Sequence, residues 1–270
     1  MLLIHIILLA TVQGVTEFLP VSSSAHLLIL HKFLDNGNSF TFDIALHAGS
    51  LVAVILYFFH DFKKLCIGGL HICINKKTQA SNLTKNIIAA SIPIVIIGLL
   101  LSLLGEIKIL RNIYVISLSL GIFGFILYLA DKKSTGSKTI DQLSFKNALF
   151  IGIWQTCSII PGASRSGTTI TALRMININK HDAVKFSMLL SIIANSGAIV
   201  LSMIHMYTHR DYSYTNLDML IGASIAFLVG YATIRVLINI VNVFSFKLFA
   251  IYRIILSIIL IVYIAITYMS

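Results

Sequence analysis

Two short stretches of this 270-residue chain carry the side chains that could do chemistry. The first, "QGVTEFLPVSSSAH" at 13–26, holds an amide, a carboxylate, three serines and a histidine. The second, "PGASRSGTT" at 161–169, holds an arginine among glycines and hydroxyl side chains. A serine beside a histidine and a carboxylate is the set that activates a nucleophile. An arginine among hydroxyls and backbone amides is suited to bind phosphate oxygens.

Gln13 and Glu17 lie four residues apart and therefore share one face of a helix. The neighbouring runs, "MLLIHIILLATV" and "LLIL", are apolar and place this carboxylate at membrane depth, where a charge costs about 2.5–3.5 kcal/mol on insertion scales. Glu17 must therefore face a polar cavity, a cation or a basic partner. This indicates a general base or a metal ligand, with a structural ion pair as the alternative.

Pro20 ends the first short helix because it lacks a backbone donor. The serines at 22–24 then supply an N-cap for a second short helix. Three hydroxyls exceed what a cap needs, so Ser23 and Ser24 are candidates for contact with a substrate. His26 lies in the first turn of that helix, within reach of a neighbouring hydroxyl.

The second stretch predicts a cradle for phosphate at the start of another short helix, "ITALRMI". Amides at a helix N-terminus bind anions, and a guanidinium adds bidentate contacts. A salt bridge from Arg165 to Glu17 is the structural alternative. The remaining candidates that could bind phosphate are Gly162, Ser164, Ser166, Gly167 and Thr169. Together the two stretches are equipped to split a phosphoric anhydride, with charge stabilisation as the largest contribution.

The elements that position these stretches are membrane helices. The chain is 57% hydrophobic and 11% charged, whereas soluble domains carry about 25% charged residues. We therefore expect an all-α polytopic membrane protein with about six transmembrane helices. The two polar stretches interrupt the apolar segments 1–34 and 148–176, and each predicts a re-entrant helical hairpin. The predicted spans are 40–59, 86–104, 113–129, 184–206, 217–237 and 247–268.

Basic residues orient the chain. Most of the lysines and arginines lie in the predicted loops 60–85 and 130–146 and in the link 174–185, which the positive-inside rule places in the cytoplasm. The net charge of +10 then indicates attraction to anionic lipid headgroups and no nucleic-acid partner. Both termini and the mouth of the first hairpin face outward, while the second hairpin enters from the cytoplasm. Arg235 and Arg253 are expected to snorkel or pair near the cytoplasmic edge.

Internal similarity predicts an inverted repeat within a single membrane domain. "LPVSSSAH" at 19–26 resembles "IPGASRSGTT" at 160–169, and "FDIALHAGSLVAVIL" at 42–56 resembles "FSMLLSIIANSGAIVL" at 186–201. The expected repeats cover about 1–104 and 113–240, with a final helix at 247–268. Such repeats place their site where they meet near the midplane. Asp43 and His47 share a helix face, either as a self-satisfied pair or as support behind the site.

On the motifs at 13–26 and 161–169, the whole chain resembles the undecaprenyl-diphosphate phosphatase family of bacterial inner membranes (the bacitracin-resistance type). The resemblance implies hydrolysis of the C55 prenyl diphosphate to the monophosphate, which recycles the carrier lipid for peptidoglycan synthesis. It also implies a divalent cation, Mg²⁺ or Ca²⁺, and a site that opens toward the periplasm. By position, the residues that match the family's functional motifs are Gln13, Glu17, Ser23, His26, Ser164, Arg165 and Thr169.

The resulting hypothesis is that Glu17 and Gln13 hold the cation while Arg165 and the amides of 162–167 hold the phosphoryl group. Ser23 attacks with His26 as base, and attack by His26 itself is the alternative. The expected partners are a polyprenyl diphosphate and membrane lipids, and a homodimer is compatible with the sequence.

Two other function classes stay open. Inverted repeats with broken helices are typical of carriers, so a transporter or flippase for an anionic lipid or solute is the main alternative. A type 2 phosphatidic acid phosphatase is less favoured, because the second histidine and paired aspartate of that group are missing after Arg165.

Overall fold

The computed structural model describes residues 2–34, 40–104, 112–208 and 214–269, and within these ranges the chain is helical without a strand. One isolated bridge joins Lys138 to Ile178. The helices are α1 (Leu2–Thr16), α2 (Ser23–Leu34), α3 (Phe40–Tyr57), α4 (Phe59–Cys73), α5 (Gln79–Leu104), α7 (Ile113–Lys133), α8 (Phe145–Thr156), α9 (Arg165–Met175), α10 (Lys180–Thr208), α11 (Asn216–Ile240) and α12 (Lys247–Met269), with the 3₁₀ turns η1 (Ile140–Gln142) and η2 (Cys157–Ile159).

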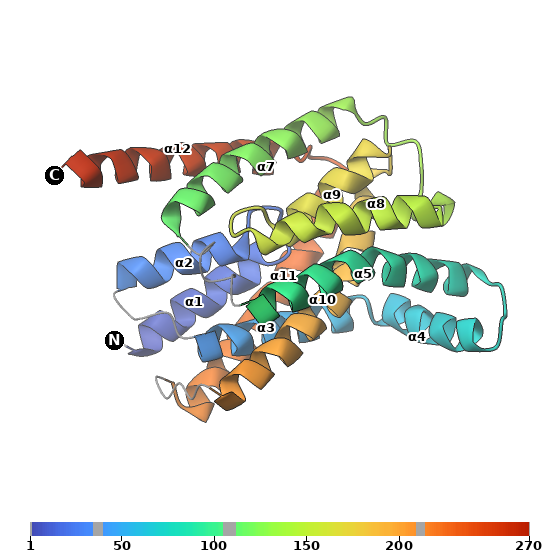
Figure 1. Cartoon of the computed structure of the whole chain (residues 1–270), viewed down its shortest axis with the longest axis horizontal. Coiled ribbons are helices and arrows are strands. Elements are labelled where there is room, and N and C mark those ends of the chain that lie inside the picture. The colour runs from blue at the N-terminus through green and yellow to red at the C-terminus, as the bar shows by residue number, and fades with distance from the viewer. Residues whose placement is uncertain (1, 35–39, 105–111, 209–213, 270) are drawn as a thin grey trace.

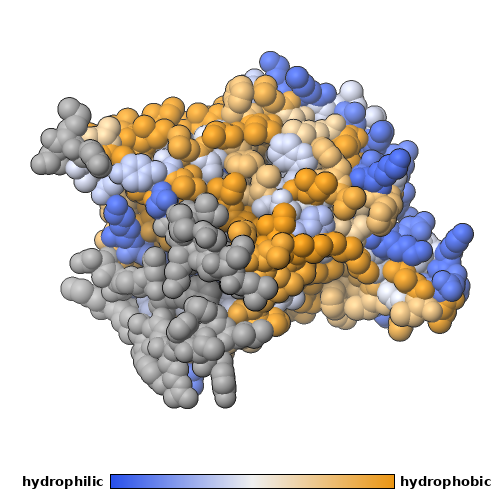
Figure 2. All heavy atoms as spheres, in the orientation of Figure 1, coloured by the Kyte–Doolittle hydropathy of each residue, from blue (hydrophilic) through white to orange (hydrophobic). Residues whose placement is uncertain are grey.

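Helices long and apolar enough to cross a membrane confirm the predicted class. Among the described residues five qualify, namely α5, α7, α10, α11 and α12, and the bent pair of α3 and α4 adds a sixth if it counts as one span. Each of the six predicted spans lies on one of these helices. Large apolar side chains on their outer faces are exposed, for example Ile96, Leu118 and Ile258. Figure 2 shows the resulting apolar surface, which suits contact with lipid chains.

The predicted loop at 60–85 is wrong in part, because Phe59–Cys73 forms α4 at 86° to α3. Its lysines and aspartate made the segment look like a loop. The helix is stable because α4 packs on α5. Gly68 allows this approach, since a Cβ there would collide with the Ala80 carbonyl and the Thr84 side chain.

The two polar stretches each interrupt a pair of short helices that pack against each other, so both predicted hairpins are present. In Figure 1, α1 and α2 enter from the end of the molecule where both chain termini lie, and α8 and α9 enter from the opposite end. The breaks at 17–22 and 157–164 therefore meet in the interior. The inverted repeat itself stays a prediction.

A buried ion pair fixes the far end of the second hairpin. Arg174 of α9 donates from Nε to Asp131 Oδ1 of α7 at 2.9 Å, and both side chains are buried. Asp131 Oδ2 also accepts from the Ser245 hydroxyl and the Phe246 amide, just before α12. One carboxylate thus holds α7, α9 and α12 together, so that α9 starts at a fixed place in the interior.

Candidate active site

Each break ends in a serine with a left-handed backbone. Ser22 has φ 77° and Ser164 has φ 67°. A positive φ in a residue other than glycine costs of order 1–3 kcal/mol and is often found at functional sites. The residue that follows each serine begins a helix, Ser23 for α2 and Arg165 for α9. These sharp turns bring the first side chain of each new helix, Ser23 and Arg165, to the same carboxylate, that of Glu17.

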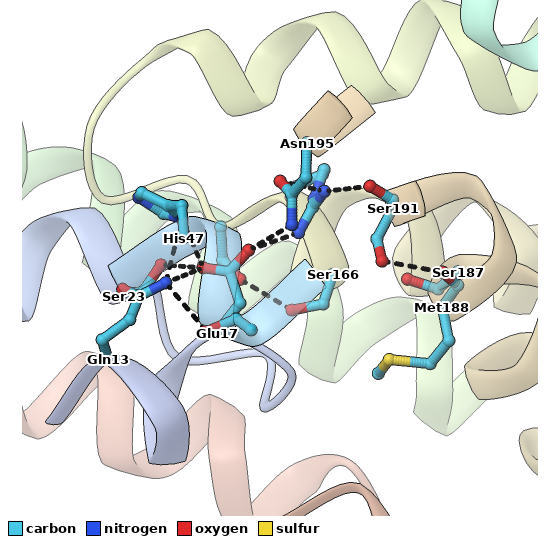
Figure 3. Close-up of polar contacts among 12 residues, drawn as sticks. Gln13, Glu17, Ser23, His47, Ser166, Ser187, Met188, Ser191 and Asn195 are labelled. Atoms are coloured by element: carbon cyan, nitrogen blue, oxygen red, sulfur yellow. Dashed lines mark hydrogen bonds and ion pairs between the residues drawn. The ribbon is translucent and has the colours of Figure 1, made fainter. Parts of the chain in front are cut away.

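The Glu17 carboxylate is the centre of the site (Figure 3). Its Oε1 accepts from Arg165 Nη2 at 2.6 Å and from Asn195 Nδ2 at 3.0 Å. Its Oε2 accepts from Ser23 Oγ at 2.7 Å and from Gln13 Nε2 at 3.0 Å. Residues of α1, α2, α9 and α10 therefore converge on one buried carboxylate. The ion pair of Glu17 with Arg165 is the structural alternative that the sequence left open.

The Arg165 guanidinium is held in place from α10. Its Nη1 donates to Asn195 Oδ1 at 2.6 Å and to the Ser191 carbonyl at 3.1 Å. Its side chain is 14% exposed, and it borders a pocket. The cation is thus fixed by its partners and still faces an open volume, as a group that receives an anionic ligand must.

His47 of α3 lies beside Gln13 and Glu17. Its Nδ1 lies 2.9 Å from Gln13 Nε2 and 3.5 Å from Glu17 Oε2. Asp43 pairs with His31 Nε2 instead, at 3.0 Å. The self-satisfied pair of Asp43 and His47 is therefore wrong, and His47 borders the site directly.

A pocket of about 210 Å³ lies between the two breaks. Its polar lining comes from Glu17, Ser22, Ser23, Ser24, His47, Ser158, Ser164, Arg165 and Asn195, and its apolar lining from Ile94, Ile159, Ala194 and Ala198. The predicted residues that line it are Glu17, Ser23, Ser24, Ser164 and Arg165. Gln13, His26, Gly162, Ser166, Gly167 and Thr169 lie behind this lining.

The residues behind the lining support the breaks. Ser166 Oγ donates to the Leu19 carbonyl at 3.0 Å and so ties the second break to the first. Thr169 Oγ1 donates to the Arg165 carbonyl at 2.9 Å and bonds the Ser187 hydroxyl. The Gly167 amide donates to Ser164 Oγ at 3.1 Å as a helix cap.

His26 makes its hydrogen bonds away from Ser23. Its Nδ1 lies 2.7 Å from the Ser22 carbonyl, and its Nε2 lies 2.6 Å from the Tyr252 hydroxyl. Since a carbonyl only accepts, Nδ1 carries the proton and Nε2 of the neutral ring accepts from Tyr252. The rings of His26 and Tyr252 also stack. The catalytic role predicted for His26 stays a prediction.

Arg253 was expected to snorkel or pair near the cytoplasmic edge, and this expectation is wrong, because the residue is fully buried and binds backbone carbonyls of the interior break. Its Nη2 donates to the carbonyls of Gly162 and Ala163, each at 2.9 Å. Its Nη1 lies 3.5 Å from the Pro20 carbonyl. The guanidinium thus connects both breaks through α12. The one available signal was a lone arginine seven residues into an apolar helix, while its carbonyl partners leave no trace in the sequence.

The side-chain oxygens of this site could hold a metal cation only together with phosphate oxygens of a bound substrate. Among the described residues no group of three or more His, Cys, Asp or Glu side chains is placed to hold a metal. However, Gln13 Oε1 is buried without a hydrogen-bond partner beside the Glu17 carboxylate. Mg²⁺ commonly binds through one or two carboxylates plus substrate phosphates. Glu17 supplies one carboxylate, and the Gln13 amide oxygen lies beside it. This pair of residues fits such a role.

The chain is similar in sequence to known proteins. The family model described as bacitracin resistance protein BacA matches residues 6–259. A protein of Pelagibacter ubique (strain HTCC1062) named undecaprenyl-diphosphatase is 41% identical, over 96% of each chain. Another of that name from Jannaschia sp. (strain CCS1) is 39% identical, over 97% of this chain and 98% of its own.

Proposed function

This chain belongs to the bacitracin resistance protein BacA family, and we propose that it hydrolyses undecaprenyl diphosphate to undecaprenyl phosphate and inorganic phosphate. It is a multi-pass membrane hydrolase of phosphoric anhydrides, and its reaction recycles the carrier lipid for peptidoglycan synthesis. A transporter or flippase is not favoured, because the relatives carry the name of a diphosphatase. The observation that carries the proposal is the contact of Ser23 and Arg165, from opposite hairpins, with one carboxylate.

In the proposed reaction Ser23 Oγ attacks the terminal phosphorus. A new bond forms between Oγ and phosphorus, the bridging phosphorus–oxygen bond breaks, and undecaprenyl phosphate leaves. The hydroxyl proton passes to Glu17 Oε2, which already accepts its hydrogen bond at 2.7 Å. Water then cleaves the serine phosphate and releases inorganic phosphate. Because phosphoryl transfer has a loose transition state, positioning and charge matter more than the strength of the base.

Arg165 binds the phosphate oxygens in this scheme. Arg165 is the first residue of α9, so the positive N-terminal end of the helix dipole adds to the charge of the guanidinium. The diphosphate competes with Glu17 for this guanidinium. As the substrate draws the cation away, Glu17 keeps its bonds from Gln13 and Asn195 and becomes freer to take the serine proton.

His26 acts as a positioning residue in this proposal. Its bond to the Ser22 carbonyl holds the strained turn that presents Ser23. For His26 to serve as base or nucleophile, as the sequence hypothesis has it, the ring would have to leave Tyr252. Variants of Ser23, His26 and Tyr252 separate these two readings.

A divalent cation, Mg²⁺ or Ca²⁺, is part of the proposal. Glu17 and the unpartnered oxygen of Gln13 would help to hold it. When bound, it neutralises charge on the diphosphate and on the leaving phosphate. The residues of the chain orient the phosphorus and accept the proton.

We also propose that the protein resides in the bacterial inner membrane with this site open toward the periplasm. The segments rich in lysine and arginine all join helices at the end opposite to the termini, where hydrophilic side chains gather in Figure 2. The positive-inside rule assigns that end to the cytoplasm.

Phosphate release by the purified protein in detergent tests the function. The expected result is inorganic phosphate from undecaprenyl diphosphate and farnesyl diphosphate by the wild type, and about 10²–10⁴-fold less from Ser23→Ala. A wild type without any release, under conditions where it is folded, would reject the proposed function.

A further inference from the structure

The pocket has two chemically different sides. Charged and hydroxyl groups occupy the side formed by the two breaks, while Ile94 of α5 and Ala194 and Ala198 of α10 form an apolar side, together with Ile159. A small phosphate ester would need only the polar side. A diphosphate joined to a long hydrocarbon needs both, since the first part of its chain must leave the charged groups without contact to them.

The apolar side is continuous with the outer surface of the protein. Ala198 is exposed although it lines the pocket, and Ile97, about one turn beyond Ile94 on α5, is exposed as well. These surfaces belong to membrane helices, so they face hydrocarbon. A ligand in the pocket can therefore extend between α5 and α10 directly into the lipid.

Two glycines beside this path, Gly98 and Gly197, face open space. A Cβ added at Gly98 of α5 or at Gly197 of α10 would meet nothing within 4 Å. Gly49 and Gly152 differ, since a Cβ there would collide with the carbonyls of Ala223 and Ala90 in neighbouring helices. Close helix packing explains the latter two glycines and does not explain the former two.

We propose that the isoprenoid chain of the substrate lies between α5 and α10, with its first unit against Ile94 and Ala194 and the following units along Ala198. The inference rests on the proposed function and adds a binding site for the hydrocarbon chain of the substrate, which the catalytic groups do not bind. Asn195 marks the boundary, since its amide binds Glu17 and Arg165 while Ala194 and Ala198 face the apolar side. A diphosphate bound to Arg165 thus has its hydrocarbon directed along α10.

The variant Ala198→Phe tests this path, with Ala232→Phe, at an exposed alanine on α11, as its matched control. The bulky ring should lower kcat/KM for undecaprenyl and farnesyl diphosphate at least about tenfold. For isopentenyl diphosphate, which has a single isoprene unit, the loss should stay below about threefold. The control should match the wild type on all three. Equal losses on all three substrates, or no loss on any, would overturn the proposal.

Photo-crosslinking of the wild type gives a second readout, which does not depend on whether a variant folds. A farnesyl diphosphate analogue with a diazirine in its first isoprene unit should label peptides of α5 and α10, and excess unlabelled farnesyl diphosphate should suppress the labelling. Labelling of α7 or α12 instead would reject the path between α5 and α10. If the wild type released no phosphate from any substrate, the proposed function would fail, while the labelled peptides would still report where the chain binds.

Discussion

Glu17 and Arg165, 148 residues apart in the sequence, form an ion pair of 2.6 Å that joins the two broken hairpins of this protein. Both side chains are largely buried, and removal of one partner of such a pair leaves an uncompensated charge. The pair also stands at the edge of the pocket, so a phosphate can replace the carboxylate as the partner of the guanidinium. One contact therefore connects the stability of the fold to the binding of substrate.

The guanidinium fork of Arg165 should matter beyond its charge. We expect Arg165→Lys to release phosphate about 10²–10³-fold more slowly than the wild type, because an ammonium group cannot bind Asn195 and a phosphate in the same fixed plane. Steady-state phosphate release by protein that elutes as a single peak from size exclusion checks this. Activity within threefold of wild type would show that a point charge is sufficient.

Glu17→Gln tests the carboxylate with little change of shape. The amide keeps a hydrogen bond to Ser23 but cannot take its proton, and it leaves Arg165 without a counter-charge. We expect a loss of about 10²–10⁴-fold in kcat and a lower melting temperature. A variant with full activity would remove Glu17 from the reaction, whatever its stability.

His26 and Tyr252 should give smaller effects than Ser23. Tyr252→Phe removes one hydrogen bond to the ring, which is worth about 1 kcal/mol, so kcat should fall less than about tenfold. His26→Ala should likewise retain measurable activity. If His26→Ala were instead as inactive as Ser23→Ala while its melting temperature was unchanged, the ring would belong to the chemistry.

Removal of divalent cations should stop turnover without unfolding the protein. We expect EDTA to abolish phosphate release and Mg²⁺ or Ca²⁺ to restore it, while the melting temperature of the substrate-free protein changes little. The reason is that Glu17 is already neutralised by Arg165 in the absence of substrate. Full activity in EDTA would contradict the part proposed for the cation.

Asp131 offers a stability test away from the pocket. Asp131→Asn leaves Arg174 buried without its counter-charge and weakens the bonds to Ser245 and Phe246. Breaking a buried pair of this kind costs about 3–5 kcal/mol. Thermal unfolding in detergent should show a clear loss, while kcat at a temperature where the variant is folded should stay within about twofold of wild type. A silent substitution would show that the pair does not hold α7, α9 and α12 together.

The helices and the two breaks could be predicted because apolar runs and their interruptions are local properties of the sequence. Glu17, Ser23 and Arg165 could be identified because charged and hydroxyl side chains at membrane depth need a reason to be there. The contact between them could be predicted because two hairpins that enter the membrane from opposite ends meet in its interior. The roles assigned to these side chains await the experiments above.

Other parts of the site left too weak a signal. Asn195 is a single polar residue in a long apolar helix, and only the structure shows that both ends of its amide bind charged groups. Arg253 binds backbone carbonyls, which every residue has, so no partner could be identified from the sequence. His47 and Asp43 share a helix face, but Asp43 pairs with His31 of another helix. Each of these contacts depends on tertiary packing.

The central claim is that Ser23 of one hairpin and Arg165 of the other serve a single phosphoryl-transfer site. A double-mutant cycle of Ser23→Ala and Arg165→Ala, measured as phosphate release from undecaprenyl diphosphate, tests it most directly. Residues that act as a unit are non-additive, so the double variant should be about as slow as the slower single variant. Losses that multiply across the cycle, or either single variant within threefold of the wild type, would contradict the account.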